Sequence, residues 1–328
     1  MTNHQDLIFV PEVELRDNQR MAEENPVRVE VERAVAKVVV SGVPEVVPHG
    51  DRIDNLKWGL DVTNMYTYWM RKMTFIANSG GVPNEMEQLN AGYREERYAE
   101  DPNFTRFSSW NGGNPVGQFE YLSGTPELSK NFDDYDYTLE NTMDAADQRH
   151  DVTTRVVISG TYTPNGFGSV ATRNGGGISF YYFKGNAIRV EAMRDMVNDR
   201  GQIPQELRDA GLEQAIENVL AWNPNAFNSP TVSFSEGGIH FYYQGVCYYT
   251  VLIRHFSNNM VPVLMGYGRY GVVRNNVYQL SINKIIGPGQ PVINPPGTDP
   301  DDEDTSWISA DVNIMRWYIR NQNVEELL

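Results

Sequence analysis

Five histidines and one cysteine are the side chains of this sequence best suited to metal binding or nucleophilic chemistry. The histidines form neither an H-E-x-x-H motif nor another paired spacing, so the sequence predicts no transition-metal site. Cys247 lies in an apolar stretch with no motif around it, and we expect a buried small hydrophobic side chain rather than a nucleophile. The histidines are His4, His49, His150, His240 and His255, and the last two lie in strand-like sequence, where packing or surface roles are expected.

Carboxylates supply two further candidates for chemistry. An acidic run near the C-terminus could bind calcium, but it lacks the glycine and the distal glutamate of an EF-hand loop, so a solvated segment is favoured. The stretch FDDYDY at 132–137 mixes aromatic faces with carboxylates, which suits sugar binding, although an ordinary surface loop is the simpler interpretation. The 43 acidic residues offer many pairs for glycoside hydrolysis, and none stands out. The acidic run comprises Asp299, Asp301, Asp302, Glu303 and Asp304.

A glycine motif, GYGRYG at 266–271, matches the G-x-G-x-x-G pattern of dinucleotide sites by its letters. Such a site needs a strand before the glycines and a helix after them, whereas strand-like sequence follows here. The motif therefore predicts a turn. Together with the preceding observations, it leads us to expect no enzyme and no cofactor or metal.

Length and charge limit the class of protein. The chain has 328 residues, 40% of them apolar, which is enough for a large core or for two small domains. A net charge of −16 repels nucleic acid and anionic membrane surfaces. A single cysteine forms no intrachain disulfide, which taken alone favours a reducing compartment. We find neither a signal peptide nor an apolar run long enough to cross a bilayer.

Strand-like stretches dominate the elements that must carry these residues. In the stretch 28–40 the alternation changes phase, which indicates a bulge. The β-branched stretch 152–163 is expected to be a central strand. We expect residues 76–151 to be loops and short strands, with tight turns around Trp110 at 107–117. The other predicted strands are 28–40, 52–63 with a loose continuation through 65–70, 178–183, a hairpin of 231–234 and 239–243, 245–256, and 272–286.

One helix is predicted, over 205–222, where Leu212, Ile216, Val219 and Leu220 form a stripe at helical spacing. Seven or more strands with one helix and no alternation of strand and helix indicate an all-β sandwich with an inserted helix.

The last part of the chain is predicted to be a strand on a flexible connection. Residues 287–304, called the tether below, are rich in proline, glycine and aspartate, and we expect them to be extended, mobile and exposed. In residues 305–328 the alternation flips at Met315, which favours two short strands separated by a bulge or break. Such a strand must add to a sheet, either its own or a neighbour's. The first apolar set is Ile308, Ala310, Val312 and Ile314, and the second is Met315, Trp317 and Ile319.

Four segments in this order resemble the Mfa-type fimbrilins, subunits of the type V pili of Bacteroidales. They are VEVERAVAKVVVS at 29–41, the tryptophan strand at 53–58, VVRNNVYQLSINKI at 272–285, and the tether with the closing DTSWISADVNIMRWYIRNQNVEEL. The resemblance implies a transthyretin-like Greek-key β-sandwich with a C-terminal two-strand extension. It divides the chain into 1–26 (linker or remnant of an N-terminal domain), 27–286 (C-terminal sandwich domain), 287–304 (tether) and 305–328 (donor strands).

The same resemblance implies a structural fimbrial subunit that donates its C-terminal strands to the next subunit. The polymer would be a head-to-tail filament, extracellular and anchored at the outer membrane, with the lipoprotein signal segment absent from this sequence. The alternatives are a tip or accessory adhesin whose aromatic loops bind host glycan or protein, and a secreted carbohydrate-active enzyme, which no motif favours. The expected donor residues are Trp307, Ile308, Ala310, Val312, Ile314, Trp317 and Ile319.

Overall fold

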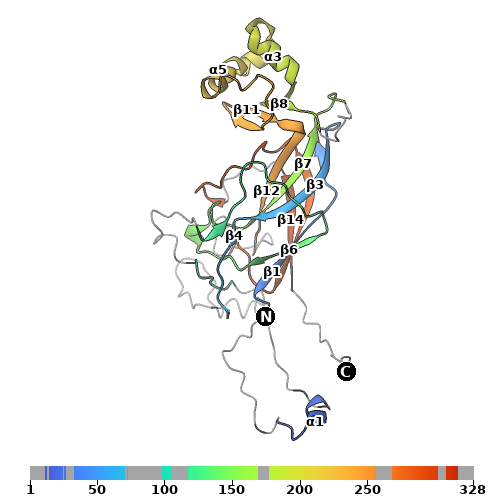
Figure 1. Cartoon of the computed structure of the whole chain (residues 1–328), viewed down its shortest axis with the longest axis vertical. Coiled ribbons are helices and arrows are strands. Elements are labelled where there is room, and N and C mark those ends of the chain that lie inside the picture. Colours follow the sequence, from blue (N-terminus) through green and yellow to red (C-terminus); the bar gives the residue numbers. More distant parts are fainter. Residues whose placement is uncertain are drawn as a thin grey trace.

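Two sheets packed face to face form the centre of the molecule in a computed structural model (Figure 1). The structure describes residues 12, 15–24, 26, 33–70, 72, 98–104, 117–168, 177–255, 268–301 and 308–316. Within these residues most regular structure is strand, as predicted for an all-β sandwich. A separate short helix, α1 (Gln19–Glu24), lies in the N-terminal part of the chain.

The first sheet has the order β14-β13-β1-β6, with β2 also paired to β13. Strand β1 runs parallel to β13, whereas β6 and β14 run antiparallel to their neighbours. The parallel β2 extends the row that β1 begins, because β1 pairs with residues 277–281 of β13 and β2 with residues 284–286. The strands are β1 (Val35–Ser41), β2 (Glu45–Val47), β6 (Tyr135–Leu139), β13 (Asn276–Ile286) and β14 (Ile308–Arg316).

The second sheet is antiparallel and has the order β12-β7-β3, with β3 (Arg52–Asp61), β7 (Arg155–Thr163) and β12 (Val246–Leu252). The prediction of a central strand at 152–163 is confirmed, because β7 has a partner on both sides and is buried on both faces over Arg155–Ile158. Its register with β3 shifts between Asp54 and Lys57, where Asn55 has a φ of 56°. A bulge of this kind increases the local bend of the strand.

The core lies between the two sheets and follows the alternation of the sequence. On β1 the buried residues are Ala36, Val38 and Val40, and on β13 they are Tyr278, Leu280 and Ile282. Trp58 of β3 is fully buried against them, and its indole N–H donates to the Asn131 carbonyl at 2.8 Å. An indole in such a position needs a partner for its N–H, and the loop before β6 provides it.

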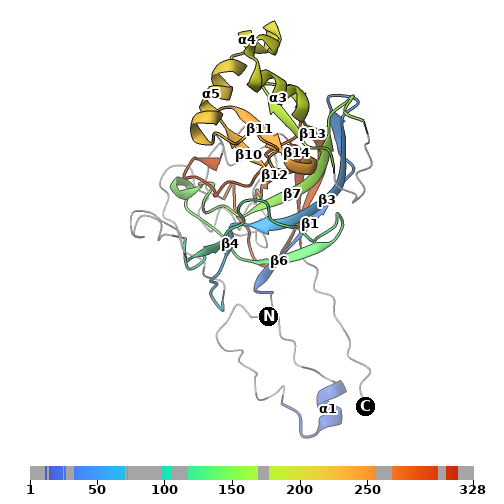
Figure 2. The same cartoon turned by 45° about the horizontal axis from the view of Figure 1, so that its top comes forward.

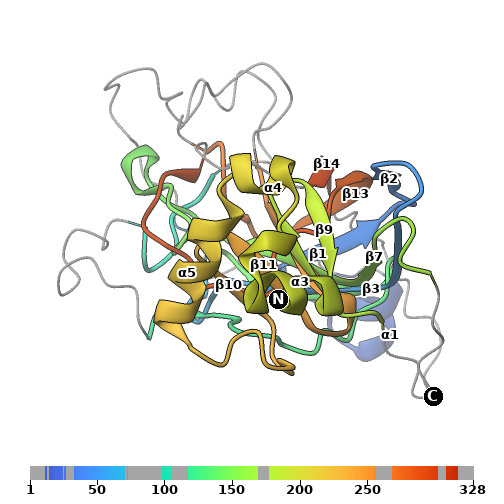
Figure 3. The ribbon, with the colours of Figure 1, turned by 90° about the horizontal axis from the view of Figure 1, so that it is seen from above.

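A second lobe joins one end of the sandwich and carries most of the helical residues (Figures 1 and 2). Its sheet has the order β10-β11-β8-β9, and helices lie over one face of that sheet, as Figure 3 shows from above. Tyr181, Phe183, Ile239 and Phe241 face the helices, whereas Phe180 and Tyr242 extend the core of the sandwich. The strands are β8 (Phe180–Phe183), β9 (Asn186–Arg189), β10 (Phe234–Glu236) and β11 (Ile239–Tyr242), so the predicted hairpin between 231 and 243 is confirmed.

The lobe holds more helix than the sequence predicts. The segment 205–222 is divided into α4 (Gln205–Asp209) and α5 (Leu212–Trp222) by Gly211, whose φ of 90° is the left-handed conformation that ends a helix. A third helix, α3 (Val190–Asn198), was not predicted. It buries only Met193 and Met196, which gives a weaker stripe than the four apolar residues of α5.

One further strand prediction needs correction, and two other predictions fall on residues that the structure does not describe. Strand β4 (Thr63–Asn64) pairs with β5 (Phe119–Glu120), and the loose strand predicted through 65–70 is absent, since that segment has no ladder partner. The first half of the predicted strand 28–40 and the turns around Trp110 lie outside the described residues.

The tether is bound to the sandwich along 287–293, which contradicts the prediction of an exposed segment there, whereas Asn294, Pro295 and 297–299 are exposed as predicted. The Gly287 and Gly289 carbonyls accept hydrogen bonds from the buried Tyr249 and Tyr242 hydroxyls at 2.8 and 2.6 Å. Gln290 exchanges backbone hydrogen bonds with Tyr248. The composition failed as a guide because prolines also fix an extended backbone, whose carbonyls then serve as acceptors.

Ile293 is the main apolar anchor of the tether. Its backbone exchanges hydrogen bonds with Gly124, and its side chain is 4% exposed in a cluster with Leu128, Val157 and Tyr248. We expect Ile293→Ala to lower the free energy of unfolding by about 2–3 kcal/mol, because it leaves a cavity in this cluster. Urea denaturation would measure the change, with the partly exposed Val292→Ala as the control. An effect of Ile293→Ala no larger than that of the control would show that Ile293 does not anchor the tether.

Candidate strand-donation site

Strand β14 is an edge strand that lies on its own domain. It pairs antiparallel with β13 from Ile308, opposite Ile285, to Arg316, opposite Asn276. No described strand pairs with its other edge. The strand therefore occupies the position from which an element can leave a sheet without breaking a second ladder.

The register sets the predicted donor residues against the buried side of β13. Ala310 and Val312 lie opposite Ile282 and Leu280 and pack, partly buried, on the sandwich core. Ile308 and Ile314 lie opposite Ile285 and Tyr278, which are buried. All four residues of the first predicted set are therefore paired with buried residues of β13. The other three predicted donor residues, Trp307, Trp317 and Ile319, lie outside the described residues.

The irregularity in this ladder lies on β13 rather than on β14. The register shifts between Ile282 and Lys284, so Asn283 is the extra residue, and Ile285 regains the buried position. The sequence predicts a bulge or break at Met315, and this is wrong for the described strand, because β14 continues in register through Arg316. The flip of the apolar pattern at Met315 is not accompanied by a change in backbone pairing.

The buried face of β13 is held by polar contacts that the sequence does not reveal. The Tyr278 hydroxyl accepts a hydrogen bond from the Val273 N–H at 2.8 Å and lies 2.7 Å from Nδ1 of the buried His255. His255 was predicted to be a packing or surface residue, and the structure confirms packing. These contacts fix the position of Tyr278 within β13.

A buried ion pair lies just before β13. Arg274 and Glu140 both have fully buried side chains, and the guanidinium Nε donates to Oε2 at 3.0 Å. The Arg274 guanidinium also donates to Thr67 Oγ1 and to the Tyr68 carbonyl at 2.9 and 2.8 Å. These contacts position the segment predicted as a loose strand, which explains why it is ordered without a ladder.

A second buried carboxyl, Asp101, lies beside this pair. Burial raises the pKa of Asp101 to about 8, and the nearby Glu140 adds to the shift. Hydrogen bonds from the Thr142 and Asn103 N–H groups and from the Asn64 amide act in the opposite direction and are outweighed. A protonated Asp101 adds no second negative charge beside the Glu140 carboxylate.

We expect Asp101 to make the fold less stable as the pH rises from about 4 to about 8. The unfolded carboxyl titrates near 3.8, so in this interval the folded state retains a proton that the unfolded state has released. The stabilisation is complete below pH 4 and is lost as the pH passes through 8. Urea denaturation across this range should show that the free energy of unfolding falls less steeply with pH in Asp101→Asn than in the parent chain. The exposed Glu206→Gln, which also removes a carboxylate, should keep the slope of the parent chain, and equal slopes for both variants would contradict the assignment.

The other residues considered for chemistry are not brought together. Cys247 is buried, and burial raises the pKa of its thiol to about 12, which confirms a packing role. Burial lowers the pKa of His240, whose Nδ1 lies 2.9 Å from Ser235 Oγ. Among the described residues no three histidine, cysteine or acidic side chains could hold one metal ion. Gly268–Gly271 lead through residues 272–275 into β13 rather than into a helix, in agreement with a turn.

The aromatic and acidic stretch 132–137 forms a turn followed by the start of β6. Tyr135 and Tyr137 are about half exposed, with ring centroids 5.3 Å apart, and the Lys37 ammonium lies 4.2 Å from the Tyr135 ring centre. Residues 132–134 thus form a surface turn, in agreement with the simpler interpretation, and 135–137 belong to β6. Of the acidic run, Asp301 is buried and accepts a hydrogen bond from the Thr153 hydroxyl at 2.5 Å, whereas 302–304 lie outside the described residues.

Comparison with known proteins agrees with the strands just described. Residues 240–323, which include most of β11 and all of β12 to β14, match the family described as major fimbrial subunit protein type IV, fimbrillin, C-terminal. That family consists of structural subunits, in agreement with the prediction that the chain is not an enzyme. No curated protein sequence matches the chain. Within the described residues, no helix has the length and apolar character needed to span a membrane.

Solved structures of low similarity come from two bacteria. A fimbrilin from Porphyromonas gingivalis W83 has 15% identity and a TM-score of 0.39, covering 89% of this chain and 60% of its own. A putative cell adhesion protein from Parabacteroides distasonis has 15% identity and a TM-score of 0.28, covering 87% and 52%. The chain thus spans between half and two thirds of their lengths, and only the family match contributes to the argument below. By that match, residues 240–323 are similar to the fimbrillin C-terminal family.

Proposed function

We propose that this chain is a structural subunit of an extracellular fimbria and that it polymerises by donating β14 to a neighbouring copy. The observation that supports the proposal most directly is the edge position of β14 on β13, within the segment assigned to the fimbrillin family. Each copy then carries both a donor, β14, and a receiving edge, the side of β13 that β14 covers. Exchange between copies gives a head-to-tail contact that does not close, which builds a filament.

The energetics of such an exchange are close to neutral in the ladder itself. Each backbone hydrogen bond contributes about 0.5–1.5 kcal/mol, but the same bonds exist when β14 lies on its own domain. A net driving force must therefore come from residues beyond the ladder, and the predicted donor residues Trp307, Trp317 and Ile319 are the candidates. We also propose that the filament is anchored at the outer membrane, as the resemblance implies.

The proposal can be tested with a peptide that replaces β14. A synthetic peptide of residues 305–320 should bind the chain truncated after residue 304, added during refolding, and should raise its unfolding temperature. The same peptide should not bind the intact chain, because β14 already covers β13. A control peptide with Ala310→Asp and Val312→Asp should not bind either, since both positions pack on the core. If the parent peptide neither binds the truncated chain nor raises its unfolding temperature, the edge of β13 is not a receiving site.

A further inference from the structure

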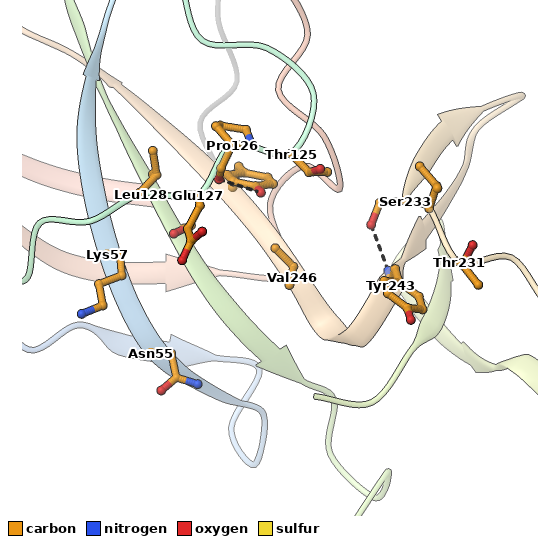
Figure 4. Close-up of a pocket in the computed structure, with 13 residues that line it drawn as sticks. Asn55, Lys57, Thr125, Pro126, Glu127, Leu128, Thr231, Ser233, Tyr243 and Val246 are labelled. Atoms are coloured by element: carbon orange, nitrogen blue, oxygen red, sulfur yellow. Dashed lines mark hydrogen bonds between the residues drawn. The ribbon is translucent and has the colours of Figure 1, made fainter. Parts of the chain in front are cut away.

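A groove runs along the junction between the helical lobe and the sandwich. Its first hollow, about 560 Å³, lies between β3, the loop at 125–128 and the segment after α5 (Figure 4). A second hollow of about 530 Å³ lies between α3 and the segments 177–179 and 229–231. Thr231 and Tyr243 line both hollows, so the two are adjacent, and the pair is called the groove below. Hollows of this size are typical of ligand sites.

Hydrogen-bonding groups from β3 and from neighbouring loops line the first hollow. Figure 4 shows Asn55 and Lys57 on one side, Glu127 on the loop, and Tyr243 on the far side. The Tyr243 N–H donates to Ser233 Oγ at 2.9 Å, which fixes the loop that carries Thr231. Amides, hydroxyls and an aromatic face are the groups that bind sugars, whose rings have both hydroxyl edges and C–H faces.

The second hollow has two arginines without a carboxylate partner among the described residues. Arg189 lies over the Phe167 ring at 4.5 Å and donates to the Gly166 carbonyl at 2.6 Å. Arg194 donates to Ser229 Oγ at 3.3 Å. By contrast, Arg200 and Arg208 of the same lobe pair with Glu217 and Glu213. An arginine that pairs with no carboxylate of its own chain can bind a ligand carboxylate with two hydrogen bonds.

The charge of the groove restricts the class of ligand. The three cations Lys57, Arg189 and Arg194 face the two anions Glu127 and Glu191, so the net charge is about +1 (3 − 2) in a chain of −16. A densely charged anion would be repelled by the rest of the chain. A ligand with few acidic groups gains from the local arginines and avoids most of this repulsion.

We propose that this groove binds an oligosaccharide that carries sparse carboxylate groups. Neutral sugar units lie along Tyr243 and the hydroxyls and amides of the first hollow. A carboxylate lies against Arg189 and Arg194 in the second hollow. The groove lies on other residues than the β13–β14 ladder, so glycan binding and strand donation can succeed or fail separately.

Isothermal titration of the whole chain would test the proposal. A hyaluronan hexasaccharide, with one carboxylate in each disaccharide, should bind at least about tenfold more tightly than neutral N-acetylglucosamine hexamer, because hydrogen bonds to charged groups are the strong ones. Its affinity should fall as sodium chloride rises from 50 to 300 mM. An oligoglutamate peptide of equal charge should bind more weakly than hyaluronan, because it lacks the hydroxyl-bearing rings.

Variants on the rim separate the site from general electrostatics. The double variant Arg189→Gln, Arg194→Gln should lose about tenfold or more in hyaluronan affinity and keep its affinity for the neutral hexamer. The exposed Arg52→Gln, which lines neither hollow, serves as the matched control and should bind as the parent chain does. Circular dichroism would confirm that each variant folds.

Three results would overturn the proposal. One is equal binding of the acidic and neutral hexasaccharides, or no binding of either at millimolar concentration. Another is tighter binding of oligoglutamate, which would make the groove a peptide site. The third is an equal loss of affinity in the double variant and in Arg52→Gln.

Discussion

Linking β14 to β13 by a disulfide is expected to abolish subunit assembly and to leave the fold intact. Gln279 and Asn313 lie opposite each other in the antiparallel register. Opposite Cα atoms in such a ladder are about 4.5–5.5 Å apart, which is within the range that a disulfide spans. The double variant Gln279→Cys, Asn313→Cys should therefore hold β14 on its own domain. When the host produces the full-length subunit with these two cysteines, the SDS-resistant polymer bands seen on gels should disappear. Addition of reductant should restore them.

The control for this experiment comes from the chain itself. The only native cysteine, Cys247, is buried with a thiol pKa of about 12, so it is a poor competitor for oxidation. Each single-cysteine variant should assemble as the parent does. Ladders that persist in the oxidised double variant would show that assembly does not need β14 to leave β13.

Replacing Arg274 by methionine is expected to lower the free energy of unfolding by about 3–5 kcal/mol, because the change leaves Glu140 as a buried charge without its partner. The ion pair is fully buried, and Arg274 also anchors Thr67 and Tyr68. Urea denaturation at pH 7 measures the change. The exposed pair of Arg208 and Glu213 gives the comparison, and Arg208→Met should have an effect below about 1 kcal/mol.

A second substitution distinguishes loss of a partner from loss of packing. The double variant Arg274→Met, Glu140→Leu removes both charges, and it should recover much of the stability lost by Arg274→Met alone. A double variant less stable than Arg274→Met would mean that the carboxylate has other partners that matter more than the arginine.

The strands of the sandwich could be predicted because their burial follows a period of two. Leu280 and Ile282 on β13 are buried, as their alternation with polar residues indicated, and Val38 and Val40 on β1 are buried in the same period. The same reasoning placed Ala310 and Val312 on one face of a terminal strand, and the register agrees. Alternation states which face is buried and not which strand lies beside it, so the pairing of β14 with β13 was left open between its own sheet and a neighbour's.

The features that could not be predicted depend on contacts between distant residues. Ile293 anchors the tether only because Leu128, Val157 and Tyr248 meet it across the fold. Arg274 has no local pattern that separates a buried arginine from an exposed one, since its partner Glu140 is 134 residues away. The groove was missed for the same reason, because its two hollows combine short segments from both lobes.

The extra residue at Asn283 has a consequence for filament geometry. A strand that arrives on β13 must satisfy two stretches of opposite phase, one before and one after this residue, so a slip by one position would turn apolar side chains outward on both sides. In a fimbria assembled through β14, the irregularity would allow only one register of the donated strand. It would set a single axial rise and rotation from each subunit to the next, and a subunit whose terminal strand had gained or lost one residue would end the growing fibre.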